Sequence, residues 1–453
     1  MRSLPTTTQR LLRFVTPFTL LGLAVASRPA GAASASAAVR LEAGLAQPVM
    51  LAGQKNKAHL RVSLFGDKAQ TTGPRPDANV CIAIDRSGSM TGEKMAAARD
   101  GARSALAKLR STDYVSVVAY DSVVEVVVPA RNASDRAAIE AGIAGVDARA
   151  GTALFAGVVK CAGEVRKFAS KNRVNRIILL SDGQANEGPS SPAQLGALGA
   201  SLAAEGISVA TVGLGVDYNE DLMVELALRS DGSHAFVQHA ADLARFLDQE
   251  LGAVAAVVAR DVEVKVLGAA GTHPLRVLGR RADVVGQTVT ATLGKINGGR
   301  QHVFVVEMDV DAMQAGSKRV VADIEIAFRD LLGNRDVTSR QRVEAQFTKV
   351  AREVDAKTDP RIMSELGMLT GDDMTQQAFK LRDQGDFSGA QRLLKQNAAQ
   401  LEATAKKWND KRVSDRASRA NKQASELSPA PGDWKVQRKE YKKSSIDDLL
   451  NGY

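Results

Sequence analysis

Asp85-Arg86-Ser87-Gly88-Ser89 directly follows the apolar run Val80-Cys81-Ile82-Ala83-Ile84, and this stretch decides the fold. Its pattern is that of a buried strand turning into a helix, with one carboxylate and two hydroxyls at the turn. Such hard oxygen ligands suit Mg²⁺ or Mn²⁺ and are unsuited to zinc or copper. Because the hydroxyls are neutral, a bound ion would keep much of its charge and could accept a carboxylate from another molecule. The motif alone is a weak signal, since Asp and Ser also gather at ordinary turns and helix N-termini.

Two further segments add oxygen ligands to the same region. Gly151-Thr152-Ala153-Leu154-Phe155 follows a polar loop and opens a helical stretch, and residues 175–183 form a second apolar strand ending in Asp-Gly. In a doubly wound sheet, ligands bind at the carboxyl ends of the strands, near the point where the strand order reverses. The three segments are therefore expected to meet there. The candidate metal ligands are Asp85, Ser87, Ser89, Thr152 and Asp182.

From about Pro76 to Val258 the chain resembles a von Willebrand factor type A domain, and the three segments resemble its metal-ion-dependent adhesion site. The resemblance implies that Asp85, Ser87 and Ser89 fill the motif Asp-x-Ser-x-Ser. It places the threonine of the family on Thr152 and its later aspartate on Asp182, and none of the five positions is substituted. The resemblance also implies that the two carboxylates reach the ion through water. A metal site that binds a Glu or Asp side chain of a partner protein is expected.

Between these segments apolar strands alternate with helical patterns, which is typical of a parallel sheet covered by helices. Val123–Val128 follows the strand Tyr114–Tyr120 almost directly, which predicts an antiparallel edge strand, because a parallel crossover needs a dozen residues or more. Further strands are expected at Ser208–Gly213 and His234–Val237. Helices are expected at Gly92–Leu109, Leu154–Ser170, Pro192–Ala204, Asn219–Leu228 and Ala241–Ala256. The fold class is α/β, with a doubly wound, Rossmann-like domain.

On both sides of this domain the apolar residues alternate with a period of two, which is typical of antiparallel strands. The clearest run is Val320, Ala322, Ile324, Ile326 and Phe328. Strands in residues 39–65 are expected to complete a β-sandwich with strands after residue 259, so the metal-binding domain is predicted to be an insertion. This arrangement is similar to that of exported bacterial proteins of the same family and, more distantly, of inter-alpha-trypsin inhibitor heavy chains.

The C-terminal part of the chain returns to a helical period. Phe379–Ala390 reads as helix, tight turn and helix and resembles one tetratricopeptide-like hairpin. A single hairpin cannot bury its own faces, so it is expected to pack on the sandwich. The predicted domains are a signal peptide (1–35), the first sandwich strands (36–72), the metal-binding domain (73–258), the rest of the sandwich (259–350), a helical hairpin region (351–426) and a basic flexible tail (427–453).

The N-terminal residues have the layout of a secretory signal peptide. Three arginines precede the apolar run Phe14–Ala26, and the small residues of 30–35 follow it. Cleavage is expected within residues 32–37. The alternative is an N-terminal membrane anchor, but the short run interrupted by Pro17 favours cleavage. The mature protein is predicted to be soluble and exported, to the periplasm or the cell exterior.

The chain contains two cysteines, Cys81 and Cys161. Strand and helix rise place both roughly 13 Å below the metal-bearing edge. They could face one another across the sheet–helix interface, and an exported chain meets an oxidising compartment. Two small buried thiols are nevertheless the favoured interpretation, because the sequence does not give the Cβ geometry that a disulfide requires.

The formal net charge of +9 lies mainly at the two ends of the chain. Residues 405–443 contain twelve Lys and Arg against five Asp and Glu, and the predicted signal peptide adds four arginines. The remainder therefore offers no strongly basic face, and no nucleic-acid partner is expected. A basic tail can make weak contact with an anionic surface. A solvated, partly disordered end is the favoured interpretation.

The sequence lacks the motifs of common enzymes. Ser87 and Ser89 have no identifiable general base, and neither a Gly-x-Ser-x-Gly elbow nor a glycine-rich phosphate loop after a strand is present. A hydrolase that used Asp85 and Asp182 around a metal-activated water would also need a positioned base and a substrate cleft. The histidines show no paired zinc-ligand spacing: His59, His234, His239, His273 and His302.

The sequence therefore predicts an exported, non-catalytic module that holds Mg²⁺, or Mn²⁺, and through it a Glu or Asp of a partner protein. Loops around Met90-Thr91, Ala185-Asn186-Glu187 and Asp217-Tyr218 are expected to set specificity. Two alternatives stay open. One is a metal-dependent hydrolase or phosphatase that uses the same ion, and the other is a structural subunit with a vestigial metal site.

Overall fold

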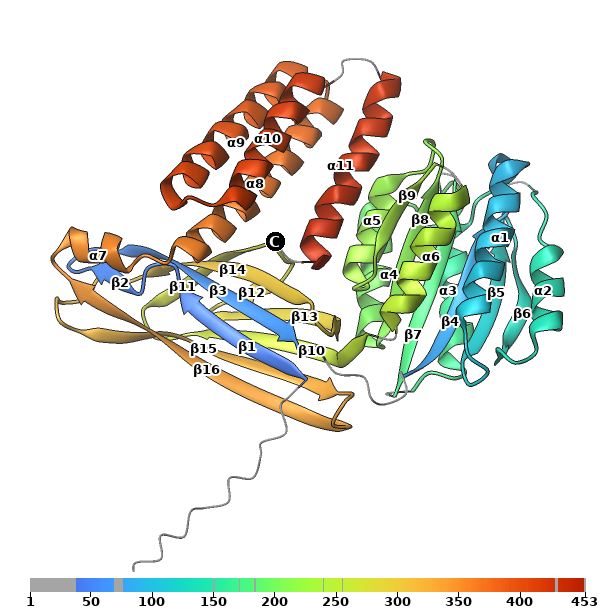
Figure 1. Ribbon diagram of the computed structural model, residues 1–453, viewed down its shortest axis with the longest axis horizontal. Helices are drawn as coiled ribbons and strands as arrows, with labels where there is room; N and C mark the ends of the chain where they lie inside the picture. The colour runs from blue at the N-terminus through green and yellow to red at the C-terminus, as the bar shows by residue number, and fades with distance from the viewer. Residues whose placement is uncertain are drawn as a thin grey trace, which may run out of the picture. The chain divides into compact units, whose positions relative to one another are not determined.

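Six strands form the sheet that carries the candidate ligands: β4 (Asp77–Asp85), β5 (Tyr114–Tyr120), β6 (Val124–Asn132), β7 (Arg173–Ser181), β8 (Ile207–Leu214) and β9 (His234–Val237). In this computed structural model their order is β6-β5-β4-β7-β8-β9 (Figure 1). All neighbouring strands pair parallel except β5 and β6, which pair antiparallel. The predicted antiparallel edge strand is confirmed, and its cause is a link too short for a crossover helix.

Helices cover both faces of this sheet. One face carries α1 (Glu93–Lys108), α2 (Arg136–Ala144) and α6 (Ala240–Val254), and the other carries α3 (Leu154–Arg166), α4 (Pro192–Ala204) and α5 (Glu220–Arg229). Side chains alternate along β4, so that Ile82 and Ile84 pack on the first face while Cys81 and Ala83 pack on the second. The doubly wound α/β fold is confirmed. Helix α2 was not predicted from the sequence.

The sandwich consists of two antiparallel sheets apart from one short parallel pair. The first contains β1 (Val39–Leu45), β3 (Asn56–Gly66), β14 (Gln301–Val310) and β11 (Thr272–Leu278), in that order. The second contains β12 (Asp283–Val285), β13 (Thr288–Asn297), β10 (Val257–Gly268), β15 (Lys318–Asp330), β16 (Arg335–Thr348) and β2 (Val49–Leu51). Because β3 pairs with β14 along its length, the domain that carries the candidate ligands is an insertion between strands of the sandwich.

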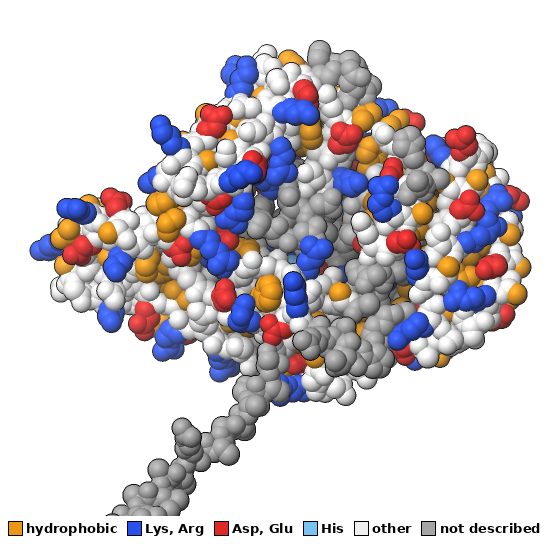
Figure 2. Space-filling model, in the orientation of Figure 1, with side chains coloured by type: hydrophobic (Ala, Val, Ile, Leu, Met, Phe, Trp, Pro, Cys, Tyr) orange, Lys and Arg blue, Asp and Glu red, His pale blue; other side chains and the backbone are white. Residues whose placement is uncertain are grey.

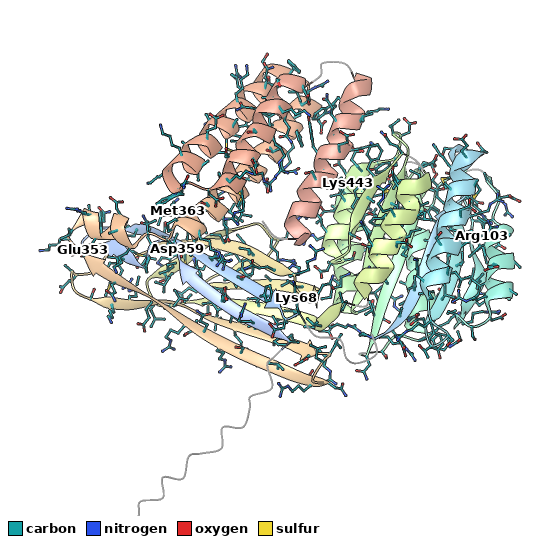
Figure 3. All side chains as sticks on the ribbon, viewed as in Figure 1. Lys68, Arg103, Glu353, Asp359, Met363 and Lys443 are labelled. Carbon is teal, nitrogen blue, oxygen red and sulfur yellow. A yellow bond between two sulfur atoms is a disulfide. The ribbon has the colours of Figure 1, made fainter. Side chains whose placement is uncertain are left out.

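The helical region consists of α7 (Ala351–Lys357), α8 (Pro360–Asp383), α9 (Phe387–Trp408), α10 (Lys411–Glu426) and α11 (Pro431–Asn451). Asp359 caps α8, because its carboxylate accepts hydrogen bonds from the N–H groups of Arg361 and Ile362 at 2.9 and 3.2 Å (Figure 3). The helix packs on the sandwich through a buried ion pair, in which Arg61 Nε of β3 lies 2.5 Å from Glu365 Oε2. The first part of α8 therefore docks on the sandwich, whereas the apolar residues of the predicted hairpin at Phe379–Ala390 pack against α10 and α11.

Helix α11 corrects the prediction of a flexible tail from residue 427. Two of its basic side chains pair closely with acids of α5: Lys439 Nζ lies 2.6 Å from Glu220 Oε2, and Arg438 Nη2 lies 2.6 Å from Asp221 Oδ2. The sequence pattern suggested disorder because the acids that pair with this segment lie far away in the chain, Asp383 on α8 and Glu220 and Asp221 on α5. Figure 2 shows Lys and Arg interspersed with Asp and Glu over the displayed face. Contact of the basic segment with an anionic surface stays a prediction.

The two cysteines form a disulfide, which corrects the preference for two free thiols. Cys81 of β4 is bonded to Cys161 of α3, with Cα atoms 5.6 Å apart. Both side chains are fully buried among the residues between the sheet and α3. The sequence placed both cysteines at the same depth but could not supply the Cβ directions. The bond ties the strand that ends at Asp85 to the helix that follows Thr152.

The structure describes residues 38–68, 76–149, 151–170, 172–182, 185–238, 240–254, 256–427 and 431–451. Residues 37–453 form one unit. The predicted signal peptide at residues 1–35, Gly183 and His239 lie outside the described residues. In the part of the chain that is described, no helix combines the length and apolar character needed to cross a bilayer.

Candidate metal centre

The two candidate aspartates lie at neighbouring strand ends. Asp85 is the last residue of β4, and Asp182 follows Ser181, the last residue of β7. β4 and β7 are adjacent in the sheet, whereas β5, the next strand after β4 in the chain, lies on the other side of β4. This is the point where the strand order reverses, and doubly wound sheets bind their ligands at such a point.

Four of the five predicted ligands form one hydrogen-bonded network. Asp85 Oδ1 accepts a hydrogen bond from the N–H of Ser87 at 2.8 Å, and Asp85 Oδ2 accepts one from the hydroxyl of Ser181 at 2.5 Å. The Oγ atoms of Ser87 and Ser89 lie 3.1 Å apart, and Ser89 Oγ donates to Asp182 Oδ1 at 2.7 Å. The turn after β4 therefore brings its two hydroxyls and the two carboxylates together.

Thr152 reaches the same edge through backbone contacts rather than through this network. The N–H of Arg149 donates to the carbonyl of Arg86 at 2.6 Å, which holds the loop before Thr152 against the turn after β4. The N–H of Thr152 donates to Asn186 Oδ1 at 2.9 Å, so the loop after β7 is fastened to it. Thr152 is buried, and no hydrogen bond between its side chain and the other four candidates is seen among the described residues.

Gly151 must be a glycine in this arrangement. Its φ is +81°, and a Cβ atom at this position would lie 2.0 Å from Ser122 Oγ and 2.3 Å from Glu187 Oε1. Ser122 and Glu187 are themselves hydrogen-bonded at 2.5 Å. The glycine therefore lets the loop before Thr152 pass close to a hydrogen bond that joins the loops after β5 and β7. This role of Gly151 was not predicted from the sequence.

Lys94 is a residue of the centre that the sequence analysis missed. Its ammonium forms an ion pair with Asp182 Oδ2, and the side chain of Asp182 is fully buried while that of Lys94 is 36% exposed. Lys94 lies in the first turn of α1, where a positive charge is unfavourable next to the helix dipole unless an acid compensates it. That unfavourable position was the available signal for an acidic partner nearby.

The electrostatics differ between the two aspartates. Burial raises the pKa of Asp85 to about 6, because desolvation disfavours the charged form, while hydrogen bonds from Ser181 and Ser87 act in the opposite direction. Asp182 has the ammonium of Lys94 as its counter-ion, whereas the hydrogen-bond donors to Asp85 among the described residues are neutral. A divalent cation between the two would supply the positive charge that Asp85 lacks. The donor set of carboxylates and hydroxyls fits Mg²⁺ or Mn²⁺.

The loops predicted to set specificity are only partly accessible. Met90 and Tyr218 are buried, with 0% and 1% of their surfaces exposed, and cannot contact a partner. Thr91, Asn186 and Asp217 are exposed beside them. A partner would therefore meet a rim of small polar and acidic side chains around the centre.

A buried arginine neutralises the acids next to the centre. Arg86 Nε lies 2.7 Å from Asp121 Oδ2, and its Nη1 lies 2.8 Å from Glu125 Oε2. Asp121 follows the last residue of β5 and would otherwise compete for a cation. The pairing leaves Asp85 and Asp182 as the carboxylates that face the centre.

Residues 79–249 match the family model described as the von Willebrand factor type A domain. The chain is 28% identical to the uncharacterized protein YfbK of Escherichia coli over 193 residues, which is 42% of this chain and 34% of the relative. It is 24% identical to the uncharacterized protein sll0103 of Synechocystis over 351 residues, which is 75% of this chain and 82% of the relative. The chain thus spans about a third of the first relative and most of the second.

Two solved structures share the fold over most of their length. One is described as von Willebrand factor type A from Catenulispora acidiphila, with a TM-score of 0.72, 17% identity, and coverage of 92% of this chain and 97% of that one. The other is the ArnB paralog VWA2 from Sulfolobus acidocaldarius, with a TM-score of 0.63, 16% identity, and coverage of 92% and 100%. At these identities the likeness concerns the fold alone.

Proposed function

Because residues 79–249 form a von Willebrand factor type A domain, a protein-interaction module, we propose that this protein binds a partner protein through a divalent cation. The ion is Mg²⁺ or Mn²⁺, and the partner fills its outward position with a Glu or Asp side chain. The ligands are Asp85, Ser87, Ser89, Thr152 and Asp182. The bound ion supplies a Lewis-acidic position that recognises a carboxylate.

The observation that carries the proposal is the network around Asp182. The fully buried carboxylate of Asp182 accepts a hydrogen bond from Ser89 and forms an ion pair with Lys94. The carboxyl edge of the sheet therefore already holds a positive charge. The hydroxyls of Ser87 and Ser89 lie 3.1 Å apart and can turn their lone pairs to one ion. Neutral hydroxyl ligands leave the ion short of negative charge, which favours an acidic ligand from outside.

The first prediction concerns Thr152. Thr152→Ala is expected to lower the affinity for Mg²⁺ by about tenfold or more, because it removes one oxygen ligand. Isothermal titration with Mg²⁺ measures this directly, and partner capture from the exported fraction, with Mg²⁺ or with EDTA, measures its consequence. Thr338→Ala, an exposed threonine of the sandwich, is the control.

Partner capture should require Mg²⁺ and should be lost in Thr152→Ala but not in Thr338→Ala. The proposal fails if the unmutated protein shows no heat of binding with Mg²⁺ or Mn²⁺. It also fails if capture survives both EDTA and Thr152→Ala, because recognition would then not depend on the ion.

Lys94 gives a second prediction about the same centre. Its ammonium occupies one oxygen of Asp182, so a metal ion and Lys94 compete for this carboxylate. Lys94→Met should raise the affinity for Mg²⁺ severalfold and lower the melting temperature of the metal-free protein. Lys108→Met is the matched control, because Lys108 belongs to the same helix and pairs with Asp248 at the surface. A weaker affinity in Lys94→Met would contradict competition and indicate that Lys94 positions Asp182 for the ion.

We also propose that the protein is not an enzyme. Both carboxylates of the centre are engaged, Asp85 by Ser87 and Ser181 and Asp182 by Ser89 and Lys94, so neither is free to act as a general base. Of the described histidines, the fully buried His234 is hydrogen-bonded to Thr211 and Tyr218. Hydrolysis with Mg²⁺ that is lost in Ser87→Ala would favour the hydrolase alternative.

Export is part of the proposed function. The sequence of residues 1–35 has the layout of a secretory signal peptide. The Cys81–Cys161 disulfide supports this location, because such bonds persist in oxidising compartments and are rare in the cytosol. A metal-dependent binding module outside the cytoplasm suits adhesion or assembly at the cell surface or in the periplasm.

A further inference from the structure

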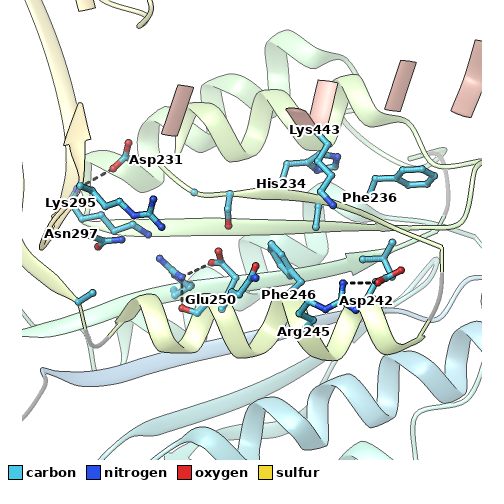
Figure 4. Close-up of a pocket in the computed structure, with 18 of the residues that line it drawn as sticks. Asp231, His234, Phe236, Asp242, Arg245, Phe246, Glu250, Lys295, Asn297 and Lys443 are labelled. Carbon is cyan, nitrogen blue, oxygen red and sulfur yellow. Dashed lines mark hydrogen bonds and ion pairs between the residues drawn. The ribbon is translucent and has the colours of Figure 1, made fainter. Parts of the chain in front are cut away.

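A second binding site is suggested by a cavity along the free edge of β9. The cavity has a volume of about 800 Å³ and is lined by β9, α6, the turn between β13 and β14, and α11 (Figure 4). None of the five candidate metal ligands lines it. Its volume lies within the range of roughly 300–1,000 Å³ that is usual for ligand pockets.

Within the described residues, no hydrogen bond is seen to the backbone groups of β9 that face away from β8. β9 is the last strand of the sheet and pairs only with β8. The carbonyls of Ser233 and Val237 accept hydrogen bonds from β8, from the N–H groups of Thr211 and Gly215, both at 2.9 Å. Because strand backbone groups alternate in direction, the N–H and C=O groups of the intervening His234 and Phe236 point away from β8. Such an edge is a template for an added strand.

The acidic side chains that line the cavity are already neutralised. Glu250 Oε2 lies 2.5 Å from the buried guanidinium of Arg176, and Asp242 Oδ1 lies 3.2 Å from Arg245 Nη1. Asp231, at the other end of the cavity, pairs with an arginine of the sandwich at 3.5 Å. None of these carboxylates is left to repel an anionic ligand.

Three cations of the lining, in contrast, have no acidic partner. Lys295 belongs to β13, Arg300 to the turn before β14, and Lys443 to α11, and within the described part of the chain none of the three side chains forms an ion pair. Figure 4 shows Lys443 beside His234, with Lys295 at the opposite end of the cavity. The uncompensated charge of the described lining is therefore positive along the length of the β9 edge.

Two polar atoms of the lining also lack a partner. Asn297 Oδ1 and Ser233 Oγ are buried, and neither makes a hydrogen bond to the residues that the structure describes. A buried polar atom without a partner costs about 1–3 kcal/mol. The side-chain oxygen Asn297 Oδ1 can accept a hydrogen bond, and a backbone N–H of a bound peptide could donate it.

We propose that this cavity binds an extended acidic segment of another protein, which adds to β9 as a further strand. Its main chain pairs with His234 and Phe236, and its carboxylates lie against Lys295, Arg300 and Lys443. A nucleic acid would satisfy the cations but not the alternating N–H and C=O groups of the strand edge. This site is independent of the metal centre and needs no divalent ion.

The test uses a fluorescein-labelled ten-residue peptide of alternating Asp and Val residues, whose binding is followed by fluorescence anisotropy. EDTA is present throughout, so that the metal centre cannot take up the carboxylates. The unmutated protein should bind the peptide, and the triple variant Lys295→Gln, Arg300→Gln and Lys443→Gln should bind it at least tenfold more weakly. The control removes three exposed cations around α7, by Lys349→Gln, Arg352→Gln and Lys357→Gln.

A second arm needs no variant and separates strand addition from simple attraction of anions. The same peptide, N-methylated at alternate residues, keeps its charge but cannot donate to the β9 edge. Its binding to the unmutated protein should be lost. Equal binding of the methylated peptide overturns strand addition, and equal binding by the triple variant overturns the location. Displacement by a single-stranded oligonucleotide at the same charge concentration would overturn the choice of a peptide ligand.

Discussion

Reduction of the Cys81–Cys161 disulfide is expected to lower the free energy of unfolding by about 4 kcal/mol. The bond joins residues with a sequence separation of 80. Closing a loop of this size stabilises the folded state by roughly 4–5 kcal/mol, because it restricts the unfolded chain. Reduction should also weaken the binding of Mg²⁺ at the candidate metal centre, even in protein that stays folded. Cys81 lies on the strand that ends at Asp85, and Cys161 lies on the helix that follows Thr152, so the bond holds the two sides of the ligand set together.

Denaturant titrations followed by circular dichroism, with and without dithiothreitol, measure this change. The double variant Cys81→Ala, Cys161→Ala should unfold at lower denaturant concentration than the oxidised protein and should not respond to the reductant. Mg²⁺ affinity should fall in the reduced protein at denaturant concentrations where it is still folded. An identical midpoint for oxidised and reduced protein would show that the bond does not stabilise the domain.

Glu365→Ala is expected to destabilise the helical region by about 3–5 kcal/mol, the range for a buried ion pair that loses one partner. Arg61 and Glu365 are 6% and 3% exposed, so the substitution leaves a guanidinium buried without its counter-ion between β3 and α8. Both tryptophans of the chain, Trp408 and Trp434, belong to α9 and α11. Tryptophan fluorescence therefore reports the unfolding of this region.

The surface pair of Arg340 and Glu325 serves as the matched comparison. Its atoms lie 2.6 Å apart, but its side chains are 76% and 30% exposed. Glu325→Ala should cost no more than about 1 kcal/mol, because water already screens this pair. If the two glutamate variants unfold at the same denaturant concentration, the Arg61–Glu365 contact does not hold the helical region on the sandwich.

Local sequence patterns were enough to predict the doubly wound sheet, because both β4 and β7 are apolar runs that end in polar turns. They also predicted that Asp85, Ser87, Ser89 and Asp182 would meet, since strand ends at the reversal of strand order share one edge of a sheet. The insertion of this domain into the sandwich followed from the period of two on both sides of it, and the pairing of β3 with β14 bears it out.

The features that the sequence did not reveal are contacts between residues far apart in the chain. The pairing of Lys94 with Asp182 spans 88 residues and that of Lys439 with Glu220 spans 219, and neither belongs to a periodic pattern. The disulfide depended on Cβ directions that strand and helix rise do not specify. The order of α11 could not be predicted for the same reason, because its compensating acids lie on α5 and at the end of α8.

The pairing of β3 with β14 has a consequence for the order in which the chain is assembled. One side of β3 stays open from the synthesis of Gly66 until that of residues 301–310, an interval on the order of tens of seconds at usual translation rates. An open strand edge invites pairing with other chains. The inserted domain is complete within residues 77–254 and pairs its own strands. It is therefore expected to fold before the later strands of the sandwich have been synthesised. Its early folding would bring the two halves of the sandwich close together and shorten the time for which β3 is exposed.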